Sequence, residues 1–151
     1  MNASQTQMRQ EVLEIPHAVV RLLENQSGAV RAAAEALRTR NPGFLVSVAR
    51  GSSDHVATYL KYASELLSGT PIASVGPSIA SVYHRKLNLA GSACISVSQS
   101  GQSPDIVRLT EAFAASGAYT VAITNDPASP LAKGTSATLP LHAGPELSVA
   151  A

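Results

Sequence analysis

From residue 44 onward, short apolar segments alternate with segments of helical periodicity, and this alternation constrains the fold more than any other feature. We expect strands at 44–48, 71–75, 93–97, 118–124 and 137–141, separated by helices at 54–68, 79–85, 105–116 and 129–133. Strands that alternate with helices at this spacing form a parallel sheet with helices on both faces. The sequence therefore predicts an α/β fold: a three-layer α/β/α sandwich with a five-stranded parallel sheet, flavodoxin-like in arrangement.

The first forty residues have the pattern of helices that precede this sheet. Pro16 interrupts the apolar spacing, because a proline inside a helix cannot donate one of the backbone hydrogen bonds. We therefore expect three short helices, at 8–15, 18–24 and 28–38. Residues 1–42 are predicted to be a helical lead-in that ends at Pro42.

A loop rich in serine, residues 98–103 (SQSGQS), joins the third predicted strand to the helix that follows it. Pro104 suits the first position of that helix, and Ser103 suits the N-cap before it. A helix start offers unpaired N–H groups and the positive end of the helix dipole, so it stabilises an anion. With the hydroxyls of Ser98 and Ser100 beside these donors, the loop is predicted to bind a phosphate group.

A second loop of this kind follows the first predicted strand, at residues 49–53 (ARGSS). Loops at the carboxyl ends of neighbouring parallel strands meet at one edge of the sheet, where such folds bind ligands. Glycine lets a ligand approach the backbone closely, and serine adds neutral donors. We therefore expect the two loops to form one pocket for a phosphate monoester on a polar metabolite.

Helix capping is the alternative explanation for these serines, since serine caps helices in many folds. Capping accounts for one serine at each helix start. It does not account for three further polar side chains within a single turn, which are Ser98, Gln99 and Ser100. For Arg50, neutralisation of a phosphate and a surface ion pair are equally open.

Composition argues against two classes of partner. The formal net charge is +1 and charged residues make up 14% of the chain, so no basic stripe for nucleic acid is expected. The apolar runs are only long enough for strands and the N-terminus is polar, so we expect neither a membrane span nor a signal peptide. The single cysteine, Cys94, lies in a predicted buried strand, where an inert thiol is expected. These features favour a cytoplasmic protein.

Several familiar motifs are missing. No G-x-x-x-x-G-K-[ST] is present and no G-x-G-x-x-G follows a strand, which argues against ATPase and dinucleotide sites. The segment Ser98-Gln99-Ser100-Gly101 lacks the first glycine of the G-x-S-x-G turn of serine hydrolases. The four histidines, His17, His55, His84 and His142, show no metal-ligand spacing. We expect no metal site and no cofactor.

Near the end of the sequence, Pro145 and Glu146 have the pattern of a helix start, with proline in the first position and an acidic residue in the first turn. A glutamate there stabilises a helix whatever the function of the protein. We expect a further helix to begin at this point, and the chain to be a piece of a longer protein.

Several segments of the sequence resemble the SIS (sugar isomerase) domain family. The likeness lies in Gly51-Ser52-Ser53, in SQSGQSPD at 98–105, in Gly144-Pro145-Glu146 with Val149-Ala150, and in EVLEIP at 11–16. It is greatest to the first SIS domain of the isomerase part of glucosamine-6-phosphate synthase and of related amino-sugar-phosphate isomerases and deaminases. The resemblance implies that residues 43–151 are an SIS domain, the first of two.

The resemblance also implies roles for residues. The implied phosphate-binding residues are Gly51, Ser52, Ser53, Ser98, Gln99, Ser100 and Ser103. The backbone of Val149 would lie near the sugar, and Glu146 is the candidate acid or base. The first loop of the family often reads Cys-Gly-Thr-Ser, so Arg50 departs from it and no thiol role is carried over.

The implied chemistry is aldose–ketose interconversion or deamination at C1 and C2 of a hexose or hexosamine 6-phosphate. In the family a second SIS domain supplies the main acid and base residues. We therefore expect this chain to be inactive alone and to work with a second SIS domain or subunit, as a homodimer and without a cofactor. The alternative is a binding module that senses a phosphosugar without converting it. The sequence does not choose among fructose, glucosamine and galactosamine phosphates.

Overall fold

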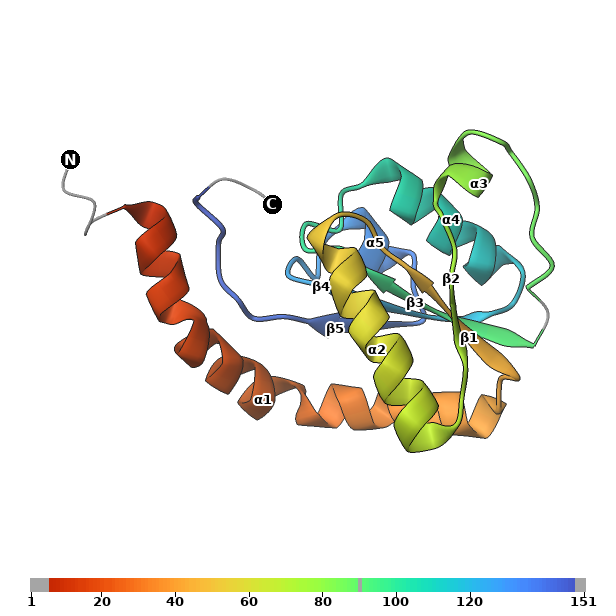
Figure 1. Ribbon diagram of the computed structural model, residues 1–151, viewed down its shortest axis with the longest axis horizontal. Coiled ribbons are helices and arrows are strands. Elements are labelled where there is room, and N and C mark those ends of the chain that lie inside the picture. Colours follow the sequence, from red (N-terminus) through yellow and green to blue (C-terminus); the bar gives the residue numbers. More distant parts are fainter. Residues whose placement is uncertain (1–5, 90, 149–151) are drawn as a thin grey trace.

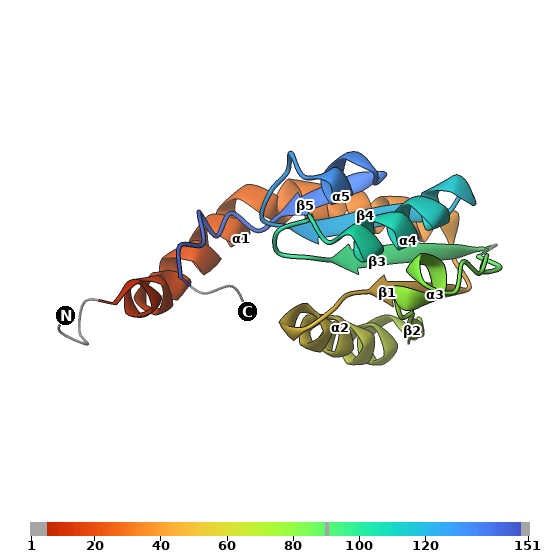
Figure 2. The ribbon, with the colours of Figure 1, turned by 90° about the horizontal axis from the view of Figure 1, so that it is seen from above.

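A computed structural model describes residues 6–89 and 91–148 and shows a three-layer α/β/α sandwich (Figure 1). Its five strands are β1 (Phe44–Val48), β2 (Ile72–Ser74), β3 (Ser92–Val97), β4 (Tyr119–Thr124) and β5 (Ala137–Pro140). All neighbouring strands run parallel, in the order β2-β1-β3-β4-β5, and Figure 2 shows them side by side. The predicted fold class is confirmed, since this is the strand order of flavodoxin-like sheets.

Helices cover both faces of the sheet. In the described part of the chain the helices are α1 (Gln7–Arg40), α2 (Ser52–Ser68), α3 (Ser78–Ser81), α4 (Pro104–Ala115) and α5 (Pro130–Lys133). Alternate residues of the strands point to opposite faces, so the sheet has two apolar cores. Val46 and Phe113 belong to the core under α4, and Leu45 and Ala57 belong to the core under α2. The helix predicted at 79–85 is a single turn.

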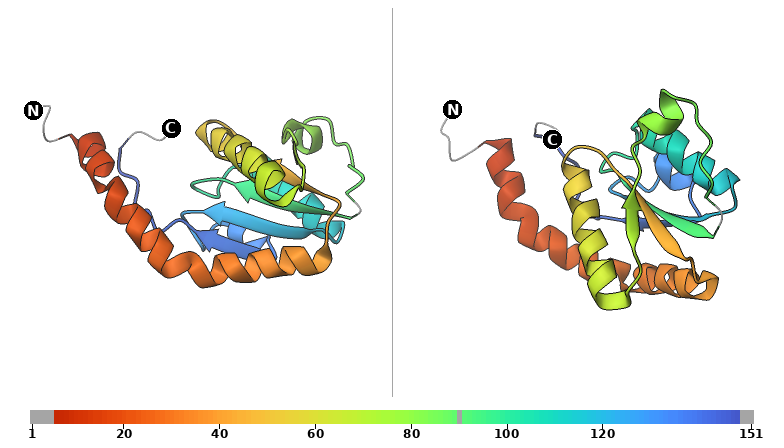
Figure 3. Two further views of the ribbon diagram at one scale, coloured as in Figure 1. Left: turned by 60° about the horizontal axis from the view of Figure 1, so that its bottom comes forward. Right: turned by 45° about the vertical axis from the view of Figure 1, so that its right-hand side comes forward.

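The prediction of three separate N-terminal helices is wrong, because α1 is one helix of 34 residues with Pro16 inside it. A proline removes one N–H from the helix ladder, but the turns on either side keep their own hydrogen bonds, and α1 bends instead of ending (Figures 1 and 3). It ends at Arg40, and the C-cap Asn41 has a left-handed backbone (φ 45°) that turns the chain away while its N–H bonds the carbonyls of Leu37 and Arg38.

The C-terminal half of α1 lies along the sheet, whereas its N-terminal half projects beyond it (Figure 3). Residues 141–148 leave β5 and run beside that projecting half, as Figures 1 and 3 show. The sequence predicted a helix that begins at Pro145. Within the described residues, which extend to Ser148, no helix begins there, so this prediction is wrong for that range. The amides of Leu147 and Ser148 instead donate to the carboxylate of Glu11. Within residues 6–89 and 91–148, no helix is long and apolar enough to cross a membrane.

Candidate functional site

The two serine loops follow β1 and β3, the adjacent strands at which the strand order reverses. From this point the chain continues outward in opposite directions, which leaves a crevice beyond the carboxyl ends of the two strands. A pocket of about 270 Å³ lies there. Its wall is formed by Arg50, Ser52, Ser53, Val97, Ser98, Gln99, Ser100, Ser103, Ile106 and Glu146.

This wall brings together the polar side chains that the sequence singled out, although they come from three separate segments. Gly51 is not on the wall; it precedes α2 with φ 58° and ψ −137° and turns the chain into that helix. Val149 lies outside the described residues. Val97 and Ile106 were not expected at the site, because their positions in an apolar strand and on an apolar helix face indicate only packing.

Hydrogen bonds within the loop at 98–103 fix its shape. Ser98 Oγ accepts from the N–H of Gly101 at 3.2 Å, and Ser100 Oγ accepts from the N–H of Gln102 at 3.2 Å. Each of these hydroxyls therefore still has a proton to donate to a ligand. The N–H of Ser98 donates to the carbonyl of Ile123 at 3.0 Å, which ties the loop to the end of β4.

Close packing holds Gly101 in place. Its φ is 62°, and a Cβ added there would lie 2.6 Å from Cβ of Ser129 and 2.9 Å from Oγ1 of Thr124. The carbonyl of Gln99 also accepts from the N–H of Asn125 at 2.9 Å and from the hydroxyl of Thr124 at 3.1 Å. The loop is therefore preorganised before any ligand arrives, because both its backbone and its packing are fixed.

Neither N-cap residue at the pocket caps its helix with a side chain. α2 has Gly51 at its N-cap and α4 has Ser103, and within the described part of the chain neither residue makes a side-chain cap hydrogen bond. Ser52 and Ser53 are the first two residues of α2. The capping explanation thus does not account for these three serines. Their hydroxyls lie at two helix starts, where unpaired N–H groups and the helix dipole favour an anion.

Arg50 forms an ion pair with Asp105, in the first turn of α4. The same arginine lies on the pocket wall, with 65% of its side chain exposed against 19% for Asp105. Burial raises the pKa of the Asp105 carboxyl, but the hydrogen bond from Arg50 and the N–H of Ile106 outweigh burial and hold that pKa below its usual value. Of the two roles left open for Arg50, the ion pair is present, and it keeps the guanidinium at the pocket.

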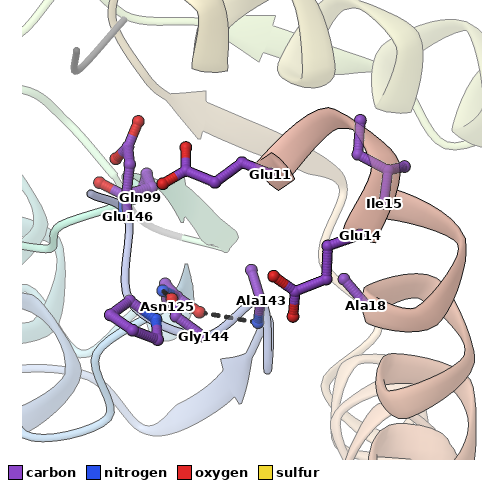
Figure 4. A pocket seen from close by; sticks show the side chains of 10 residues that line it. Glu11, Glu14, Ile15, Ala18, Gln99, Asn125, Ala143, Gly144 and Glu146 are labelled. Atoms are coloured by element: carbon purple, nitrogen blue, oxygen red, sulfur yellow. Dashed lines mark hydrogen bonds between the residues drawn. The ribbon is translucent and has the colours of Figure 1, made fainter. Parts of the chain in front are cut away.

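A second cavity of about 240 Å³ adjoins this pocket, and Gln99 and Glu146 line both. Figure 4 shows that its opposite wall is α1, from which Glu11, Glu14, Ile15 and Ala18 face the cavity. Glu146 thus lies between the two cavities. The segment EVLEIP had been singled out in the sequence without a role, and the structure places its glutamates at this cavity.

The remaining candidates for chemistry lie elsewhere. Cys94 is completely buried, and burial raises the pKa of its thiol to about 12 despite a contact with the hydroxyl of Ser96. The predicted inert core thiol is confirmed. Among the described residues, no group of three or more His, Cys, Asp and Glu side chains is arranged to hold a metal ion.

Comparison with known proteins gives consistent results. The SIS domain family matches residues 40–151. Glutamine–fructose-6-phosphate aminotransferase (isomerizing) of Sulfolobus acidocaldarius is 35% identical over 112 residues, which are 74% of this chain and 18% of that protein.

Solved structures share the fold. A protein of Silicibacter pomeroyi DSS-3, provisionally described as a phosphosugar isomerase, is 57% identical and superimposes with a TM-score of 0.89. The match covers 95% of this chain and 44% of the Silicibacter chain. The sugar isomerase domain of the RpiR transcription factor from Sphaerobacter thermophilus is 25% identical with a TM-score of 0.73, over 90% of this chain and 75% of its own. The chain thus spans less than half the length of the relatives from Sulfolobus and Silicibacter, and three quarters of the regulator's domain.

Proposed function

Because this chain belongs to the SIS domain family, we propose that it is the sugar-phosphate-binding domain of an aldose–ketose isomerase or deaminase acting on hexose or hexosamine 6-phosphates. One observation carries the proposal: two serine loops and Glu146, far apart in sequence, line a single pocket at the switch point of the sheet. The names of the relatives from Sulfolobus and Silicibacter support it.

The polar wall suits a phosphate monoester at one end of a polyhydroxylated ligand. The hydroxyls of Ser98 and Ser100 have protons to donate, and Ser103 has no cap hydrogen bond to give up. Arg50 lies at the same wall and adds a positive charge. These groups would bind the phosphate, with Gly51 shaping the turn that brings Ser52 and Ser53 to it.

Phosphate binding orients the reacting end of such a ligand. Binding energy at a distant phosphate fixes the position of C1 and C2, and a carboxylate that moves a proton between these carbons interconverts aldose and ketose. Glu146 is the carboxylate of the described residues on this wall. We assign it the role of proton acceptor, and Val149 a backbone contact with the sugar.

A second proposed element is a partner. Moving a proton to and from a sugar needs an acid as well as a base, and Glu146 and Arg50 are the charged residues that the described part of the chain places on the wall. We propose that residues 43–151 form one SIS domain, that 1–42 lead into it, and that a second SIS domain or a second copy in a homodimer completes the site. A cytoplasmic location belongs to this proposal, in keeping with the unpaired thiol of Cys94.

A phosphosugar sensor is the second candidate, and the similarity to the sugar isomerase domain of a transcription factor favours it. The same pocket would then bind a sugar phosphate without converting it. The two candidates differ in one measurement on the full-length protein: an isomerase or deaminase consumes bound fructose or glucosamine 6-phosphate, whereas a sensor returns it unchanged.

Calorimetric titration tests the binding role. Fructose 6-phosphate and glucosamine 6-phosphate are expected to bind, and the unphosphorylated sugars are not. Ser100→Ala removes one donor to the phosphate and should weaken binding by about tenfold, which corresponds to about 1.4 kcal/mol. Ser27→Ala, an exposed hydroxyl on α1, is the control and should bind like the unmodified chain. Equal affinity for fructose and its phosphate would overturn the proposal.

A further inference from the structure

The segment that carries Glu146 has no regular secondary structure, so its position depends on other elements. After Leu141, whose N–H bonds the carbonyl of Thr124, residues 142–148 contain no helix or strand. Asn125 holds one part of the segment: its Oδ1 accepts from the N–H of Ala143 at 3.0 Å, and its Nδ2 donates to the carbonyl of Gly144 at 2.6 Å. These contacts end two residues before Glu146.

Glu11 of α1 holds the part beyond Glu146. Its Oε1 accepts from the N–H of Leu147 at 2.7 Å and from the N–H of Ser148 at 3.0 Å, and its Oε2 accepts from the hydroxyl of Ser148. Hydrogen bonds to an ionised acceptor are about twice as strong as neutral ones. The carboxylate of Glu11 accepts three such hydrogen bonds. They join Glu11 to residues that lie 136 and 137 positions later in the sequence.

The contact resembles a helix N-cap supplied by another helix. A side-chain oxygen normally accepts from the second or third N–H of the helix that it precedes. Here the segment after Pro145 offers its N–H groups in the same way, and Glu11 accepts them from a distant element. The hydroxyl of Ser148 and the N–H of Leu147 lower the pKa of the Glu11 carboxyl, and together they outweigh the opposite effect of burial.

Glu14, one turn along α1, does not share this contact. Its carboxylate pairs with Arg21 at 2.8 Å, and Arg21 in turn donates to the carbonyl of His142 at 3.1 Å. In Figure 4 the side chain of Glu11 extends across the cavity toward the segment that carries Glu146, whereas Glu14 points toward Ala143. Glu14 thus reaches the segment only through Arg21, at the carbonyls of His142 and Ala143, and not at Leu147 or Ser148. Its substitution therefore separates this attachment of the segment from the one that Glu11 makes.

We propose that Glu11 is a positioning residue: by holding Leu147 and Ser148, it keeps Glu146 on the wall of the phosphate pocket and makes the projecting half of α1 part of the ligand site. This inference rests on the proposed function of that pocket. Glu11 is absent from the wall itself, so it acts on a ligand through the segment and not by direct contact.

Hydrogen exchange of single amides tests the contact without any ligand. We compare the unmodified chain with Glu11→Ala, Glu11→Gln and the matched control Glu14→Ala. The amides of Leu147 and Ser148 should exchange at least tenfold faster in Glu11→Ala. Glu11→Gln should lie between, because an amide oxygen accepts the same N–H groups without the charge. Glu14→Ala should match the unmodified chain. Unchanged exchange in Glu11→Ala, or equal acceleration in Glu14→Ala, would contradict the inference.

Ligand titration of the same four proteins tests the consequence for the site. Glu11→Ala should lower the affinity for fructose 6-phosphate about fivefold. The affinity for inorganic phosphate should stay the same, because the serine loops that would hold phosphate do not contact Glu11. Glu11→Gln should restore most of the affinity. If Glu11 had a merely structural role, its loss would lower the affinity for both ligands equally. That result would overturn the inference. If the unmodified chain protects both amides and binds no sugar phosphate, the proposed function fails while the contact of Glu11 stands.

Discussion

The two loops of the pocket carry similar residues but are held in different ways. The loop at 98–103 is tied to β4 and to the residues after it by its backbone, and Gly101 packs against Ser129 and Thr124. In the loop at 49–53, a Cβ added to Gly51 would have nothing within 4 Å, although Ala49 is buried in the core under α2. The N–H of Asp54 donates to the Gly51 carbonyl, and Arg50 pairs with Asp105. The loop at 98–103 is therefore packed around its glycine, whereas the loop at 49–53 is not.

This difference indicates a division of labour at the pocket. A fixed loop binds an anion without an ordering cost, because its donors already point to the ligand. A loop that is not packed around its glycine is expected to lose more conformational entropy on binding, which lowers the affinity. Substitutions in the two loops should separate these effects, and they are ordered here from the largest expected change in stability to the smallest.

Gly101→Ala should have the largest effect. The new methyl group would clash with Ser129 and Thr124, and the backbone at residue 101 has a positive φ that strains any residue with a side chain. The free energy of unfolding should therefore fall by about 3 kcal/mol or more. Urea unfolding followed by circular dichroism measures the change. Sugar phosphate binding should be lost together with stability, because the loop cannot keep its shape.

Gly51→Ala should have a smaller effect. Nothing lies within 4 Å of the added methyl group, so the cost is limited to backbone strain at φ 58°, which is about 1–2 kcal/mol. The same unfolding experiment provides the comparison. If Gly51→Ala destabilises the protein as much as Gly101→Ala, the distinction between a packed loop and an open loop is wrong.

The ion pair of Arg50 with Asp105 should contribute least. Arg50 is largely exposed, so solvent screening limits the pair to about 0.5 kcal/mol. Because the pKa of Asp105 is lower in the folded protein than in the unfolded chain, its contribution is complete above the usual carboxyl pKa of about 4 and is lost as the pH falls through the folded value.

The measurement for this pair is the difference in unfolding free energy between the unmodified chain and Asp105→Asn. It should be present at about pH 7 and shrink toward zero at about pH 3. A difference that is constant between these pH values would show that the charge of Asp105 does not stabilise the loop at 49–53.

Much of the fold could be predicted from the sequence because its signals are local. Alternating strands and helices, with glycine and proline at their ends, indicate the parallel sheet, and the serines after two strands indicate which loops border its crevice. The continuity of α1 could not be predicted from Pro16 alone. Proline marks a missing hydrogen bond, but packing of the C-terminal half against β5 decides whether the helix ends.

The site was predicted in part for the same reason. Residues of the two loops lie next to recognisable helix starts, so their local sequence indicates their chemistry. Glu11 accepts from Leu147 and Ser148, and the pattern of residues 11–16 contains no signal for a partner at the other end of the chain. Contacts of this kind depend on how the projecting half of α1 and the last segment lie side by side, which only the folded arrangement determines.

The outer strands of the sheet also restrict how this domain can associate with others. β2 has three residues and β5 ends in Pro140, which has no N–H to offer to a further strand. Adding strands from another polypeptide at either margin is therefore disfavoured. The outer side of α2, by contrast, exposes Tyr59, Tyr62, Leu66 and Leu67. The second SIS domain proposed above would then contact helical faces, leaving the crevice between β1 and β3 open to small molecules.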